Sequence, residues 1–173
     1  MDGRLLATTF GSGLEALLFA GDTLTPYARA VGERAKDVDA RAAATEYLTT
    51  MQEMYLDLRR LVFNTGCRAL LVPTLRTTFV AADNDPGTDT YRLNGQDLPG
   101  RGWFATTPFN ILNHCPVVNV PTGLAEGNGV PTGLQIVADA YEDLDAFQIA
   151  AAYAGIAPRF FSANLVPDYR DQP

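Results

Sequence analysis

The side chains that most often act as nucleophiles or bases are scarce in this sequence. Among 173 residues there is one histidine, His114, one lysine, Lys36, and two serines, Ser12 and Ser162. A serine becomes a useful nucleophile only when a neighbouring base activates its hydroxyl. No recognisable pair of that kind occurs here, and a helix cap or a surface position explains each serine. The sequence therefore predicts no catalytic residue within this chain.

The dipeptide His114-Cys115 raises the possibility of a thiol nucleophile. Neighbouring side chains on an extended strand point to opposite faces, whereas a catalytic pair needs both groups within hydrogen-bond reach. Cys67 could instead meet His114 across space, and a purely structural histidine is the simpler interpretation. Two cysteines without a C-x-x-C pattern do not form a disulfide framework, which favours a reducing, cytoplasmic setting.

The charge and hydropathy of the chain exclude two classes of partner. The formal net charge is −7 and 47% of the residues are hydrophobic. Nucleic acids and anionic membranes both attract basic patches, so neither is expected to bind. No apolar run approaches the ~20 residues that span a bilayer. The apolar run at 14–20 is short and contains Glu15, so no signal peptide is expected either.

The acidic segment "DNDPGTD" at 83–89 resembles a calcium loop only superficially. An EF-hand loop needs Gly at its sixth position and Glu at its twelfth. Counted from Asp83, Gly87 comes one position early and Asn94 stands where the glutamate should be. We therefore expect a solvated loop, with no metal ion and no other cofactor.

Helical patterns dominate the first part of the chain. Ser12 with Glu15 forms a capping-box pattern, and Thr25-Pro26 is typical of a second helix start. From 37 to 64 apolar residues follow the i, i+3, i+4, i+7 rule, which predicts a long amphipathic helix. Its stripe comprises Tyr47, Leu48, Met51, Met54, Tyr55, Leu58, Leu61 and Val62. At about 1.5 Å per residue it would be as long as a small domain is wide, so we expect it to lie across a larger body.

Three strands are expected, at 68–72, 117–120 and 133–138. The tetrapeptide Val-Pro-Thr-Gly at 120–123 should end one of them, and its second copy at 130–133 should begin the next. Residues 73–102 contain many turn-forming residues and show no clear periodicity, which predicts an irregular connection.

Two shorter helices complete the expected elements. The first is a single turn around Phe109–Asn113. The second begins near Asp143, and its inner face should consist of Leu144, Phe147, Ala150, Ala151 and Ala154.

Several short motifs follow one another in a fixed order between residues 68 and 155. They are "LLVPT", Pro108-Phe109-Asn110, Cys115-Pro116, a V-x-V-P-x-G pattern at 118–123, "GVPTGLQIV" and an alanine-rich helix. In this order and spacing they resemble the C-terminal part of the amidase-signature enzymes, which are serine hydrolases of linear amides. The resemblance implies an α/β fold in which part of a mixed β-sheet is flanked by helices, as one domain or fragment over residues 1–173.

The Gly- and Ser-rich region that holds the catalytic Ser-Ser-Lys set of this family has no counterpart here. The resemblance therefore implies a segment that completes the sheet and shapes the acyl pocket, and that is inactive alone. It implies a pocket bordered by Trp103, Phe109, Asn110, His114 and Cys115.

Two partners are compatible with such a segment, and they lead to two hypotheses. A segment carrying Ser-Ser-Lys would complete an enzyme that acts on a small amide. Alternatively, the chain is a non-catalytic module of amidase ancestry that associates with itself, through the long helix and the open edges of a three-stranded sheet.

Overall fold

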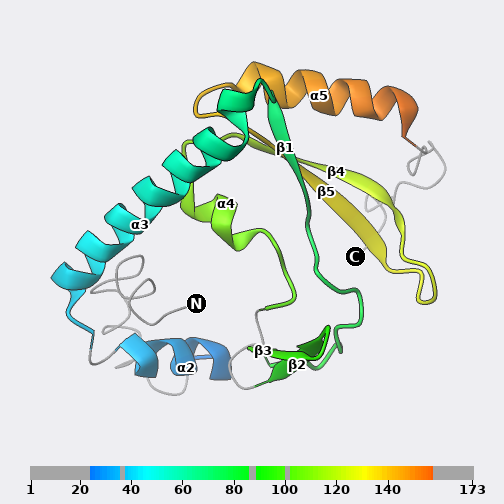
Figure 1. The fold of residues 1–173 in the computed structure, drawn as a ribbon. Coiled ribbons are helices and arrows are strands. Elements are labelled where there is room, and N and C mark those ends of the chain that lie inside the picture. The colour runs from blue at the N-terminus through cyan, green and yellow to red at the C-terminus, as the bar shows by residue number, and fades with distance from the viewer. Residues whose placement is uncertain (1–23, 36–37, 86–88, 100–101, 158–173) are drawn as a thin grey trace, which may run out of the picture.

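The computed structural model describes residues 24–35, 38–85, 89–99 and 102–157. Expectations for Ser12, Lys36 and Ser162 lie outside the described residues. In chain order the elements are α2 (Pro26–Ala35), α3 (Ala40–Leu61), η2 (Phe63–Thr65), β1 (Ala69–Pro73), β2 (Thr90–Leu93), β3 (Gln96–Pro99), α4 (Thr107–Ile111), β4 (Val117–Leu124), β5 (Pro131–Ala138) and α5 (Asp143–Ile156). Figure 1 shows α5 and the C-terminal half of α3 beside a small sheet, whereas α2 lies away from that sheet.

The larger sheet has the strand order β1-β5-β4, which confirms the three expected strands. Both pairings are antiparallel, so the parallel pairing that a mixed sheet also requires is not among those described. The central strand β5 is the most deeply covered part of the sheet, and its residues 135–138 are all buried. Because β1 and β4 each have one unpaired side within the described residues, the sheet exposes backbone hydrogen-bonding groups at both edges.

The expected end of the strand at the first Val-Pro-Thr-Gly is wrong. Strand β4 runs on to Leu124, and its register shifts between Pro121 and Gly123. Proline is tolerated there because β4 is an edge strand, where a missing N–H costs no ladder bond. The second copy behaves as expected, since β5 begins at Pro131.

The irregular connection expected at 73–102 contains a β-hairpin that the sequence analysis missed. Strands β2 and β3 pair antiparallel from Thr90↔Pro99 to Leu93↔Gln96. Their two-residue turn is Asn94-Gly95, with φ values of 50° and 80°. This dipeptide is the strongest short-range hairpin signal, because both positions of the turn require positive φ.

The long helix α3 is confirmed, and it starts and ends on local signals. The Asp39 side chain accepts hydrogen bonds from the backbone N–H groups of Arg41 (2.9 Å) and Ala42 (3.1 Å). Val62 caps the C-terminal end of α3 and leads into the short turn η2, after which Gly66 adopts a left-handed conformation with φ of 90°. Helix α2 is also confirmed, because the Thr25 hydroxyl accepts the Ala28 N–H at 3.2 Å.

The core lies where the middle of α3 meets β5 and the segment after α4. It is centred on Leu112, Cys115 and Val137. Packed against these are Met51, Met54, Tyr55, Leu58, Leu70, Phe109 and Val117. The stripe of α3 is narrower than predicted, since Leu48 and Leu61 are exposed. Leu61 is the last residue of α3, and Figure 1 shows that the N-terminal half of the helix, to which Leu48 belongs, extends away from the sheet region.

The predicted inner face of α5 is wrong. Leu144 and Phe147 are 67% and 63% exposed, whereas Ala146 is fully buried. Apolar residues are spread around the whole helix, and its polar residues Asp143, Asp145 and Gln148 lie in the first two turns, so periodicity could not choose an inner face. The small alanine allows close approach to the sheet. Its start also differs by one residue, because Glu142 is the N-cap and Asp143 is already helical. The short helix α4 agrees with the expected turn around Phe109.

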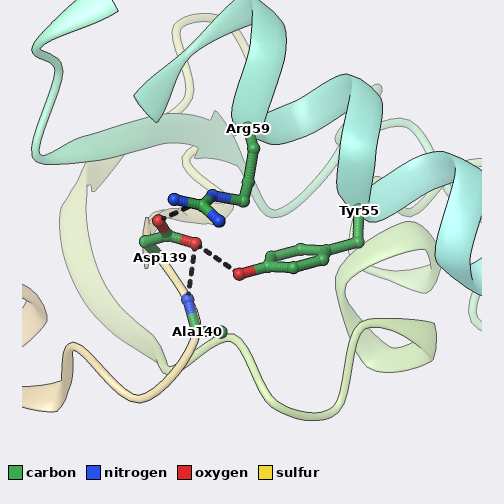
Figure 2. Close-up of polar contacts among 4 residues, drawn as sticks. All are labelled: Tyr55, Arg59, Asp139 and Ala140. Atoms are coloured by element: carbon green, nitrogen blue, oxygen red, sulfur yellow. Dashed lines mark hydrogen bonds and ion pairs between the residues drawn. The ribbon is translucent and has the colours of Figure 1, made fainter. Parts of the chain in front are cut away.

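The carboxylate of Asp139, just after β5, interacts with two side chains of α3 (Figure 2). Asp139 Oδ1 accepts hydrogen bonds from the Tyr55 hydroxyl and from the Ala140 N–H, both at 2.8 Å. Its other oxygen lies 3.3 Å from Nε of Arg59. Burial, and then the bond to Asp139, raise the pKa of the Tyr55 hydroxyl. Both oxygens of this partly covered carboxylate therefore have partners, as a buried charge requires.

We expect Tyr55→Phe to lower the free energy of unfolding by about 1–2 kcal/mol, because Asp139 loses one of its hydrogen-bond donors. Urea denaturation followed by circular dichroism measures the change. Tyr141→Phe is the matched control, since the Tyr141 side chain is exposed, and it should change stability by less than about 0.5 kcal/mol. Equal effects of the two substitutions would contradict the anchoring role of the Tyr55 hydroxyl.

Candidate functional site

A pocket of about 440 Å³ lies between the segment that follows β1 and the ends of β4 and β5. Pockets of this volume are within the range that small ligands occupy. Its lining is rich in threonine: Pro73, Thr74, Leu75, Arg76, Thr77, Thr78, Phe79, Thr122, Thr132, Gly133 and Leu134.

The two Val-Pro-Thr-Gly copies meet in this wall. Their threonines, Thr122 and Thr132, lie across the β4–β5 pair with hydroxyl oxygens 2.8 Å apart. The Thr132 hydroxyl is also 3.2 Å from the carbonyl oxygen of Gly123, to which it can donate. The repeat therefore places two hydroxyls side by side at the pocket, a role that turn chemistry alone did not suggest.

On the β1 side of the pocket, Thr74 is hydrogen-bonded to Gly133 of β5. Both the backbone N–H and the hydroxyl of Thr74 donate to the Gly133 carbonyl, at 2.9 and 3.0 Å. A Cβ on Gly133 would lie 3.2 Å from the Oγ1 and Cγ2 atoms of Thr74. This close approach explains why the second copy carries a glycine at this position.

The segment beyond Thr74 is held by further hydrogen bonds. Ala105 N–H donates to Thr74 O at 3.0 Å, and Arg76 N–H donates to Trp103 O at 2.7 Å. The Asn128 side chain, in the β4–β5 turn, donates to the carbonyl and hydroxyl oxygens of Thr78 at 3.1 and 3.2 Å. The pocket wall is thus tied to the β4–β5 turn and to the Trp103 segment.

The residues predicted to border the acyl pocket lie elsewhere in the structure, and none of them lines this pocket. Phe109 and Cys115 belong to the core, and Asn110 is exposed. The Trp103 ring packs edge-to-face on Phe104, with ring centroids 5.0 Å apart. The indole Nε1 of Trp103 is buried without a hydrogen-bond partner in the described part of the chain.

His114 packs against Tyr55, whose hydroxyl donates a hydrogen bond to Asp139. Its ring packs edge-on against Tyr55, with centroids 4.6 Å apart, and is 6.4 Å from the ring of Tyr141. The Tyr141 N–H donates to the His114 carbonyl at 3.1 Å. These contacts join His114 to α3 and to the loop after β5.

The cysteine next to His114 is unsuited to act as a nucleophile. Burial first, and then the negative charge of Asp139, raise the pKa of the Cys115 thiol to about 11. A thiol with this pKa is protonated at neutral pH, whereas the thiolate is the reactive form. Cys67 is exposed, and its sulfur lies 3.4 Å from the Thr65 hydroxyl.

The threonines of the pocket were missed because they carry no catalytic signature. The available signal was the repeat itself, which predicted strand boundaries and placed Thr122 and Thr132 ten residues apart. Only the hairpin register brings them together.

Metal clusters and membrane spans are both absent from the described part of the chain. Within it no three His, Cys, Asp or Glu side chains group in a way that could hold a metal ion. None of its helices is both long and apolar enough to cross a membrane.

Solved structures share the fold of this chain. An aryl acylamidase of bacterial origin, belonging to the amidase-signature family, matches 88% of this chain with a TM-score of 0.60 and 26% identity. A chain from a vestigial protein complex tied to the origins of an s-triazine catabolic enzyme matches 92% with a TM-score of 0.70, and at 18% identity it supports the fold alone.

Curated relatives match over shorter segments. A glutamyl-tRNA(Gln) amidotransferase subunit from Mycobacterium bovis is 40% identical over 60 residues, which is 35% of this chain. The corresponding subunit from Nocardia farcinica is 44% identical over 50 residues, or 29% of this chain. No protein-family model matches.

This chain is related to the amidase-signature enzymes. The matches span 12% and 10% of the two curated relatives, and 33% of the aryl acylamidase chain. The α/β fold expected from the amidase-signature motifs is confirmed, and the relatives support an origin among amidase-type hydrolases.

We expect Gly133→Ala to destabilise the chain by about 1–3 kcal/mol, because the new methyl group would crowd Thr74 in a packed wall. Chemical denaturation measures the effect. Gly155→Ala is the matched control: nothing lies near its Cβ position in α5, and alanine favours a helix by about 0.5–1 kcal/mol. The same sign for both substitutions would contradict the close-approach argument.

At pH 8 we expect one fast-reacting thiol per folded chain, because Cys67 is exposed while Cys115 is buried with a raised pKa. Titration with a chromogenic disulfide measures this. Cys67→Ser should abolish the fast phase and Cys115→Ser should leave it unchanged. A fast phase that disappears in Cys115→Ser would restore the thiol-nucleophile hypothesis.

Proposed function

We propose that this chain is the C-terminal segment of an amidase-type hydrolase that acts on linear carboxylic amides. The supporting observation is that it matches amidase structures over about nine tenths of its own length while spanning about a third of theirs. Residues 1–173 then act as one domain or fragment that completes a larger sheet. The edges of β1 and β4 and the exposed apolar side chains of α5 are surfaces suited to that role.

In this proposal the catalytic Ser-Ser-Lys set lies on another segment, missing here or carried by a partner chain. The serine would attack the amide carbonyl, an amine or ammonia would leave, and water would release the acid from the acyl-enzyme. The described residues contribute no step of this chemistry. The protein would work in the cytoplasm, with a small amide as its substrate in the complete enzyme.

The segment from Trp103 to Cys115 would border the acyl part of the substrate. Asn110 is exposed and His114 is half-buried, so these two can face a ligand. Phe109 and Cys115 would support them from the core side. The unpartnered indole N–H of Trp103 is a hydrogen-bond donor that a substrate could satisfy.

A second candidate function is a non-catalytic module that associates with itself. It is favoured by the exposed apolar side chains on α3 and α5, which include Leu48, Leu56, Leu144, Phe147 and Ile156. A self-associating module would cover such side chains without any amidase partner.

Amide hydrolysis assays separate the two functions. We expect the isolated chain to release no acid from simple aliphatic and aryl amides above the buffer rate. Co-expression with a segment that carries a Gly- and Ser-rich amidase signature should produce activity, and replacing the signature serine by alanine in that segment should remove it. Hydrolysis by the isolated chain would contradict the proposal.

Sedimentation of the isolated chain provides the second measurement. The enzymatic proposal predicts a 1:1 complex with the signature-bearing segment. A stable homodimer that does not exchange with that segment, and that stays inactive beside it, would favour the self-associating module instead.

A further inference from the structure

We propose that the threonine-lined pocket binds a small organic carboxylate with a short apolar tail. This inference goes beyond the proposed function, because it concerns a site outside the 103–115 segment and holds whether or not another chain supplies a catalytic serine.

The charge of the pocket favours an anion. Arg76 is the one lining residue with a formal charge, and the described lining contains no aspartate or glutamate. This is notable in a chain with a net charge of −7. The arginine side chain is exposed and makes no hydrogen bond or ion pair with a described residue, whereas Arg59, Arg60, Arg68 and Arg92 are all in ion pairs. A guanidinium group left open in this way matches the geometry of a carboxylate.

Two hydroxyl groups beside Arg76 have a proton to donate. The Thr77 hydroxyl accepts the Phe79 N–H at 3.2 Å, and the Thr78 hydroxyl accepts from Asn128 at 3.2 Å. A hydroxyl group has one hydrogen to donate and two lone pairs that can accept. In Thr77 and Thr78 a lone pair of the oxygen accepts the hydrogen bond that fixes the side chain, so the O–H hydrogen can still be donated to a ligand. Thr74, in contrast, already donates to Gly133. Arg76, Thr77 and Thr78 thus form a consecutive run of donors.

The pocket also has an apolar part that suits a hydrocarbon tail. Leu75 and Leu134 line the pocket, and Phe79 at its border is 72% exposed. Covering a large exposed aromatic side chain is favourable, at about 25 cal/mol per Å² of apolar surface. An anion without a hydrocarbon tail would bind the donor groups and leave this apolar surface exposed to water. An organic acid would contact both the donor groups and the apolar side chains.

The experiment is a titration of the ¹⁵N-labelled full chain with hexanoate, followed by nuclear magnetic resonance. We expect the amide signals of Thr77, Thr78 and Phe79 to shift. Hexanamide is the neutral isostere, and it should bind at least about tenfold more weakly because it lacks the charge. Inorganic phosphate, which lacks the tail, should also bind more weakly than hexanoate.

Matched variants assign the binding to these side chains. Arg76→Gln should weaken hexanoate binding about tenfold, and Thr78→Val, which keeps the side-chain shape, about threefold or more. Arg60→Gln removes the same charge from an exposed position on α3 and should leave the affinity unchanged.

Four results would overturn the inference: no shift at the pocket amides, equal affinity for hexanamide, equal affinity for phosphate, or equal weakening by Arg60→Gln and Arg76→Gln. The test needs no amide hydrolysis. Its failure therefore leaves the proposed function standing, and a failure to gain amidase activity leaves the pocket inference standing.

Discussion

The arrangement of this chain depends on one carboxylate at the end of its central strand. Asp139 follows the buried residues of β5 directly, and its two oxygens take donors from Tyr55, Arg59 and the Ala140 backbone. A carboxylate in a partly covered place is stable only when such partners replace its water. Two of these donors, Tyr55 and Arg59, come from α3, so the helix must lie across the end of β5 in one orientation. This orientation brings the apolar face of α3 onto the core.

The hydrogen bond between Asp139 and Tyr55 also positions His114 and Cys115, which lie just before β4. Tyr55, held by Asp139, packs edge-on against the His114 ring, and the His114 carbonyl accepts the Tyr141 N–H. Cys115 then enters the core beside Val137. Burial first, and then the negative charge of Asp139, raise the pKa of its thiol. The ring of His114 thus makes an aromatic contact, and its cysteine neighbour packs in the core.

The exposed apolar surface of α5 is consistent with the relation of this chain to longer proteins. Beyond Gln148, helix α5 has apolar residues on every side; it buries the small Ala146, while Phe147 stays exposed. A helix that is apolar all round is typical of the interior of a larger body. The chain spans a third of the aryl acylamidase chain that it matches. Under the proposed function, the exposed side chains of α5 would pack against the rest of a longer enzyme.

Local patterns in the sequence determined where the helices and strands form. The tertiary structure decided which face of each helix is buried and which residues line the pocket. The apolar stripe from Met51 to Leu58, the Thr25-Pro26 helix start and the strand at 68–72 were predictable because each is encoded within a few residues. The hairpin at Asn94-Gly95 was encoded as clearly and was overlooked. The inner face of α5 and the pocket were not encoded locally. A helix with apolar residues on every side has no periodicity to choose a face, and Thr122 meets Thr132 only through the register of two paired strands. Sequence spacing fixes which residues share an element, whereas contact across elements depends on packing that no local pattern specifies.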